Sequence, residues 1–167
     1  MFGRVAIVGM GAIAMAACSS TPGTFTVTGH LVGNTCDLPA YDPWVFDVAL
    51  SETSQSSQSV LTWSYEDGSP VLSGPISSQL EVVLTSSDIA NVDPTEGGAD
   101  GPCTMERDDR IDITLNSATA PTSFTGTLGY SFTASAGSNC ADQLIGAGGM
   151  YQALPCSVSY TLTALRQ

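Results

Sequence analysis

Few side chains in this 167-residue sequence are suited to catalysis. The chain has one histidine, His30, and no lysine. Lysine-nucleophile and Schiff-base chemistry are therefore excluded, and a Ser-His-Asp triad would have to use His30. The nucleophile-elbow pattern G-x-S-x-G is absent, and the alternation of apolar residues places His30 on the solvated face of its segment. We therefore predict no catalytic residue and a protein that is not an enzyme.

One acidic stretch has the composition of a cation site. Calcium takes about six to eight oxygen ligands, which a flexible acidic loop with glycines can supply. However, the spacing is not that of an EF-hand, and Arg107 and Arg110 lie inside the stretch and can neutralise part of it. We therefore favour a solvated acidic loop and predict no metal and no cofactor, with calcium as the alternative. The acidic residues are Asp93, Glu96, Asp100, Glu106, Asp108, Asp109 and Asp112.

The amino-terminal segment has the layout of an export signal. A short start containing Arg4 precedes 13 apolar or small residues, Val5 to Ala17, too few to span a bilayer. The junction Met15-Ala16-Ala17-Cys18 resembles a lipobox, the maturation motif of bacterial secreted lipoproteins, although Met15 stands where leucine is usual. The resemblance implies cleavage before Cys18, a diacylglyceryl thioether on Cys18 and an acylated amino terminus. Ser19 is not the aspartate associated with inner-membrane retention, so an outer-membrane location is expected.

Four cysteines remain after Cys18, an even number that predicts two disulfides in an oxidising compartment. Cys140 and Cys156 flank a glycine-rich segment without strand character, so we predict the pair Cys140–Cys156. Cys36–Cys103 then follows by elimination, although four cysteines allow three connectivities. Zinc sites usually need two cysteines at C-x₂₋₄-C spacing, and no two cysteines here are that close.

Charge limits the partners of the chain. Without the leader, Arg107, Arg110 and Arg166 stand against 16 acidic residues, a net charge of −13. Such a surface repels nucleic acid and is not drawn to anionic lipid. We expect a monomer that meets the membrane through its lipid only, with any protein or ligand partner unspecified.

The elements that position these residues are predicted to be strands. Seven segments alternate apolar and polar residues and are rich in Thr, Val, Tyr and Phe, separated by Gly, Pro, Ser and Asn. We predict an all-β, antiparallel β-sandwich of seven or eight strands, stapled by disulfides, with a small β-barrel as the alternative. The sandwich is preferred because connections such as 86–102 look long; residues 51–59 read as a polar loop. The alternating segments are 25–31, 44–50, 61–65, 80–84, 111–115, 124–132 and 156–164.

The domain organisation follows from these segments. We predict a signal peptide over 1–17, a short lipidated tether over 18–23 and a single all-β domain over 24–167. The function expected is that of a non-enzymatic lipoprotein of the cell envelope, a structural or binding module displayed at the membrane surface. One alternative is a carrier of a small apolar ligand, with Trp44, Trp63 and Phe124 lining a cavity. Another is a hydrolase of envelope polymers, which needs two converging carboxylates.

Overall fold

A computed structural model describes residues 23–55, 58–66, 71–93, 102–118 and 120–167. The predicted all-β class is confirmed, with eight strands among these residues. Two short 3-10 helices, η1 (Ala141–Gln143) and η2 (Ile145–Ala147), lie between the last two strands. The strands are β1 (Gly23–Asn34), β2 (Trp44–Gln55), β3 (Gln58–Tyr65), β4 (Val71–Pro75), β5 (Glu81–Asp93), β6 (Cys103–Leu115), β7 (Ser123–Ala134) and β8 (Cys156–Arg166).

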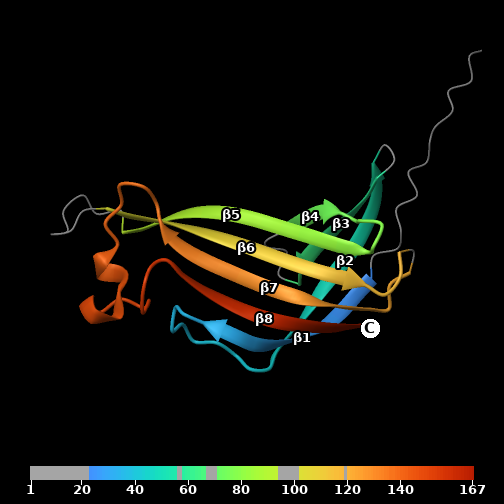
Figure 1. Cartoon of the computed structure of the whole chain (residues 1–167), viewed down its shortest axis with the longest axis horizontal. Helices are drawn as coiled ribbons and strands as arrows, with labels where there is room; N and C mark the ends of the chain where they lie inside the picture. Colours follow the sequence, from blue (N-terminus) through green and yellow to red (C-terminus); the bar gives the residue numbers. More distant parts are fainter. Residues whose placement is uncertain (1–22, 56–57, 67–70, 94–101, 119) are drawn as a thin grey trace, which may run out of the picture.

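All eight strands belong to one antiparallel sheet, which curls into a nearly closed barrel (Figure 1). The strand order is β4-β3-β2-β1-β8-β7-β6-β5, so β4 and β5 are the two edges. These edges meet at a bridge between Ile76 and Val82. The preferred sandwich is therefore wrong and the barrel alternative is right. A β-carbon on Gly74 would lie 2.2 Å from the Val83 carbonyl oxygen, so this glycine permits the close approach of the two edges.

Two segments predicted as loops are largely strand. β2 and β3 extend to Gln55 and from Gln58, so most of 51–59 is paired. β5 extends to Asp93 and β6 starts at Cys103, so the described part of the expected long connection is also mainly strand. Residues 51–59 are all polar, and the apolar residues Ile89 and Val92 of β5 are exposed rather than buried. The apolar alternation used for the prediction is lost there.

Buried apolar residues from all eight strands form one core. Trp63 is fully buried, with its ring centroid 5.7 Å from that of Phe124. Phe124 also packs against Phe25 at 5.4 Å. Trp63 and Phe124 therefore fill the core. They are two of the three residues that were predicted to line a ligand cavity.

The two ends of the barrel differ. Gly23 and the carboxyl terminus lie at one end, where the Gln167 N–H donates to the Thr24 carbonyl. At the other end β4 and β3 have stopped, while β5 to β8 and β1 continue, and the η1–η2 segment lies against them (Figure 1). The inner face of the sheet is therefore only partly covered at this second end, which we call the open end. No helix among the described residues is long and apolar enough to cross a membrane.

Candidate functional site

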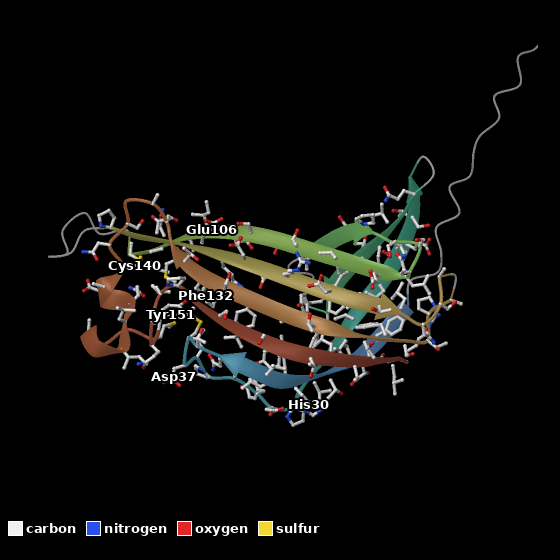
Figure 2. All side chains as sticks on the ribbon, in the orientation of Figure 1. His30, Asp37, Glu106, Phe132, Cys140 and Tyr151 are labelled. Carbon is white, nitrogen blue, oxygen red and sulfur yellow. A yellow bond between two sulfur atoms is a disulfide. The ribbon has the colours of Figure 1, made fainter. Side chains whose placement is uncertain are left out.

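The sequence-predicted site residues are scattered. Cys18 and the rest of 1–22 lie outside the described residues, as do Glu96 and Asp100. His30 is exposed, as predicted, and its Nδ1 lies 3.2 Å from Asp42 Oδ1 (Figure 2). Within the described ranges no group of three or more His, Cys, Asp or Glu side chains is arranged to hold a metal ion.

The described residues of the acidic stretch, predicted to be a solvated loop with calcium as the alternative, lie on strands instead. Asp93 ends β5, and Glu106, Asp108, Asp109 and Asp112 belong to β6. The expected neutralisation by arginine is confirmed. Arg110 Nη2 lies 2.7 Å from Asp112 Oδ1 on the outer face, which raises the pKa of Arg110 through the hydrogen bond and the charge of Asp112.

The disulfide pairing predicted from the sequence is wrong. Cys36 bonds to Cys156, and Cys103 bonds to Cys140. The reason is strand adjacency: β1 pairs with β8 as far as Asn34–Val158, which brings Cys36 next to Cys156 rather than to Cys103. The segment between Cys140 and Cys156 contains no strand, as expected, but it folds back on the start of β6.

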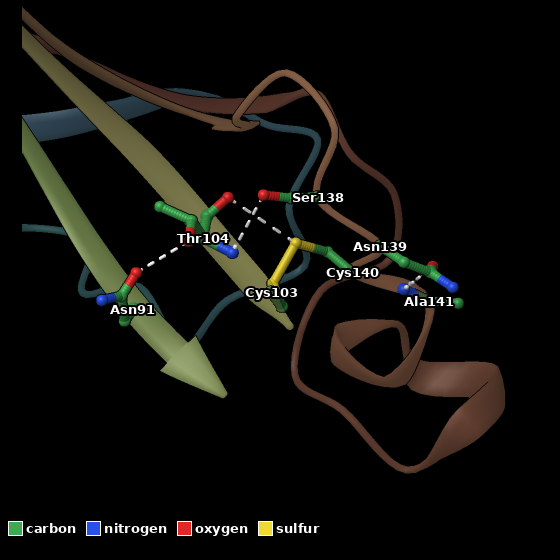
Figure 3. The surroundings of a disulfide bond; sticks show 7 residues. All are labelled: Asn91, Cys103, Thr104, Ser138, Asn139, Cys140 and Ala141. Carbon is green, nitrogen blue, oxygen red and sulfur yellow. Dashed lines mark hydrogen bonds between the residues drawn. A yellow bond between two sulfur atoms is a disulfide. The ribbon is translucent and has the colours of Figure 1, made fainter. Parts of the chain in front are cut away.

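Both disulfides lie at the open end and hold its loops. Cys36–Cys156 fixes the segment that leaves β1, and the Gln152 N–H donates to the Cys36 carbonyl. Cys103–Cys140 fixes the η1–η2 segment, next to Thr104, whose N–H donates to Ser138 Oγ (Figure 3). The rim of the open end is thus covalently tied to the sheet.

A continuous set of aromatic rings covers the inner face at the open end. Trp44 lies 4.3 Å from Phe46 and 5.4 Å from Tyr160, measured between ring centroids, and Phe46 lies 5.7 Å from Tyr65. A side-chain hydrogen bond joins Tyr160 to Tyr130. We call this set the aromatic strip; its members are Tyr65, Phe46, Trp44, Tyr160, Tyr130, Phe132 and Tyr151.

The strip crosses from one side of the barrel to the other. Tyr65 and Phe46 lie on β3 and β2, whereas Tyr130 and Phe132 lie on β7. Tyr151, from the segment after η2, packs on Phe132 at 5.2 Å (Figure 2). Most of the rings are half-buried because the open end leaves the inner face uncovered.

One arginine lies over the strip. The Arg107 guanidinium carbon is 5.0 Å from the centroid of Tyr130 and 5.9 Å from that of Phe132, within cation–π range. Its Nε and Nη2 both donate to Asp109 Oδ1, at 3.1 and 2.9 Å. Ser86 Oγ donates to the other Asp109 oxygen at 3.5 Å. Asp109 is 12% exposed while Arg107 is 49% exposed, so the carboxylate positions a guanidinium that still faces water.

A hollow of about 220 Å³ lies on this surface, between the strip and the segment that follows Cys36. Trp44, Tyr130 and Tyr160 supply ring atoms to its wall. Pro39, Ala40 and Tyr41 also line it, and Tyr41 is 75% exposed. The hollow is therefore lined by four aromatic residues and is open to solvent.

Tyr130 should remain protonated far into the alkaline range. Burial raises its pKa to about 12, with Tyr160 adding to the shift and the charge of Arg107 opposing it. Because the folded-state pKa lies above the ordinary value of about 10, stability from the neutral phenol is fully present below about pH 10. It should be lost as the pH rises through about 12. We expect an ultraviolet tyrosinate titration to contain a late component that disappears in Tyr130→Phe; superimposable curves above about pH 11 would contradict the assignment.

Sequence reasoning found only part of this site. Trp44 was predicted to line a ligand cavity, and Arg107 was predicted only to neutralise part of the acidic stretch. Tyr41, Tyr160 and Asp109 were missed as site residues. One signal was available: Arg107 and Asp109 have the same inward parity on β6 as the buried Ile111 and Ile113. A charged pair between the buried inward residues Met105 and Ile111 indicates a break in the apolar lining of the sheet.

Asp109 is held by Arg107, and His30 is exposed on the outer face. Comparison with known proteins found no matching family model, no matching curated protein and no matching solved structure.

Proposed function

We propose that this chain is a non-enzymatic lipoprotein of the bacterial envelope, anchored through Cys18, whose barrel domain is a binding module. The observation that carries the binding assignment is the aromatic strip, partly uncovered at the open end and bordered by the Arg107–Asp109 pair. Partly exposed aromatic side chains with fixed polar neighbours are the usual composition of a ligand site.

The position of the strip supports display at a membrane. The described chain starts at Gly23, five residues after Cys18, and these residues can span at most about 18 Å. Gly23 therefore stays near the lipid surface in this proposal. β1 runs 12 residues from Gly23 to Asn34, and at about 3.3 Å per residue its far end is about 36 Å away along the strand. The open end thus faces away from the membrane.

The anchor can be tested by fatty-acid labelling. Wild-type protein expressed in a bacterial host that processes lipoproteins should incorporate labelled palmitate and partition into a detergent phase. Cys18→Ser should abolish both, because the thioether needs the sulfur. Ser19→Asp is the matched variant: it should keep the label and move the protein from the outer to the inner membrane. A mature-sized Cys18→Ser product that still partitions normally into membranes would refute the anchor.

A further inference from the structure

We propose that the aromatic strip binds a neutral oligosaccharide, taking one sugar ring in the hollow between Trp44 and Tyr41. This inference rests on the proposed binding function and names its ligand class. A pyranose ring has a face of C–H groups and a rim of hydroxyls. The C–H groups are attracted to the negative face of an aromatic ring, and the hydroxyls need donors and acceptors close to that face.

The open end offers both features. Trp44, Tyr130, Tyr160 and the exposed Tyr41 all line the hollow. The Arg107 guanidinium lies 5.0 Å over Tyr130 and is half-exposed, so it can donate to hydroxyl groups while Asp109 holds it in place. The hollow of about 220 Å³ is smaller than the roughly 300–1,000 Å³ of a typical whole-ligand pocket. It therefore fits one ring-sized unit of a longer chain that continues along the strip.

Charge selects a neutral ligand. The sequence carries a net charge of −12, and Asp109 compensates the charge of Arg107. An anionic polymer approaching this surface would meet repulsion without an unpaired cation at the strip to offset it.

Polarity argues against a purely apolar ligand. An acyl chain laid on the strip would remove water from the Arg107 guanidinium, which is half-exposed. Desolvating polar groups without replacing their hydrogen bonds is costly. Sugar hydroxyls replace those hydrogen bonds, whereas hydrocarbon does not.

Trp44 itself can report binding. The chain has two tryptophans, and Trp63 is fully buried in the core. In Trp63→Phe, the only remaining tryptophan is the one at the site. We would purify this variant from the full-length gene in a detergent without a sugar headgroup and titrate it with cellohexaose, laminarihexaose and maltohexaose. At least one should change Trp44 emission saturably, and hexagalacturonate, the charged counterpart, should bind at least about tenfold more weakly.

Tyr41→Ala and Val45→Ala form a matched pair, because both side chains are exposed but only Tyr41 lines the hollow. Tyr41→Ala and Arg107→Ala should each weaken binding at least about fivefold, as expected for central aromatic and arginine contacts, while Val45→Ala stays within about twofold.

Three outcomes would overturn the inference. The first is that no neutral hexasaccharide changes Trp44 emission. The second is that Tyr41→Ala and Val45→Ala weaken binding equally. The third is that dodecanoate changes Trp44 emission saturably and the sugars do not. Because this readout does not depend on membrane partitioning, failure here leaves the Cys18 anchor intact. Failure of palmitate labelling likewise leaves the sugar site intact.

Discussion

Replacing both Cys36 and Cys156 with serine should lower the free energy of unfolding by about 4–5 kcal/mol. The bond joins residues 120 positions apart, so its loss frees most of the unfolded chain. A loss of that size is a large part of the roughly 5–15 kcal/mol available to a typical domain. We expect a large drop in the denaturation midpoint in urea, measured under non-reducing conditions. The variant should also lose hexasaccharide binding, because Cys36 holds the segment that carries Tyr41.

The Cys103→Ser, Cys140→Ser double variant is the matched control. Its loop spans 37 positions, so chain entropy predicts a loss smaller by about 1 kcal/mol. It frees the η1–η2 segment rather than the Tyr41 segment, and sugar binding should be weakened less. A larger destabilisation from this second pair would contradict the loop-length argument.

Trypsin can distinguish the pairing in the structure from the pairing predicted from the sequence. The chain has no lysine, and Arg107 and Arg110 separate Cys36 and Cys103 from Cys140 and Cys156. With the pairs Cys36–Cys156 and Cys103–Cys140, both bonds cross this boundary, so the two large tryptic fragments stay joined until reduction. With Cys36–Cys103 and Cys140–Cys156 they would separate without reductant. Fragments that separate on a denaturing, non-reducing gel would overturn the pairing described here.

The sequence predicts strands well wherever one face meets the core. The alternation of Leu61, Trp63 and Tyr65 marks β3 because these residues point inward against a covered interior. The prediction fails for β4, whose five residues include Gly74 and end at Pro75. It also fails for the distal halves of β5 and β6, where the apolar alternation is interrupted: Arg107 and Asp109 take inward positions between the buried Met105 and Ile111.

Barrel closure and disulfide pairing depend on contacts between distant strands. The sheet curls into a barrel through the pairing of the first and last strands, β1 and β8, which no local pattern indicates. Likewise, Cys36 meets Cys156 because the first and last strands are neighbours in the sheet. A residue pattern read along the chain contains neither fact, so the sandwich and the predicted disulfides both failed for the same reason.

The candidate site was only partly predictable because its aromatic residues continue the pattern of the core. Trp44 and Trp63 occupy equivalent inward positions in their alternating segments, and the sequence assigns them the same role. In the structure Trp63 is fully buried, whereas Trp44 is half-buried at the open end. The difference comes from where the neighbouring strands end, which is a property of the whole sheet.

Because of this difference in burial, we expect alanine substitution to destabilise the fold much more at Trp63 than at Trp44. Trp63→Ala should cost about 3–5 kcal/mol of unfolding free energy, because it removes a fully buried ring that packs against Phe124 and leaves a cavity. Trp44→Ala should cost about 1–2 kcal/mol, because the ring is already partly in water and loses mainly its contacts with Phe46 and Tyr160.

Hexasaccharide binding should distinguish the two tryptophan variants further. At a temperature where both variants remain folded, Trp63→Ala should retain most of the hexasaccharide affinity and Trp44→Ala should lose it, measured by isothermal titration calorimetry. The substitutions are chemically identical, so the comparison isolates position in the barrel from the loss of an indole ring. If Trp44→Ala destabilised the fold as much as Trp63→Ala and left sugar binding unchanged, Trp44 would belong to the core. The open end would then be a covered part of the interior rather than a site.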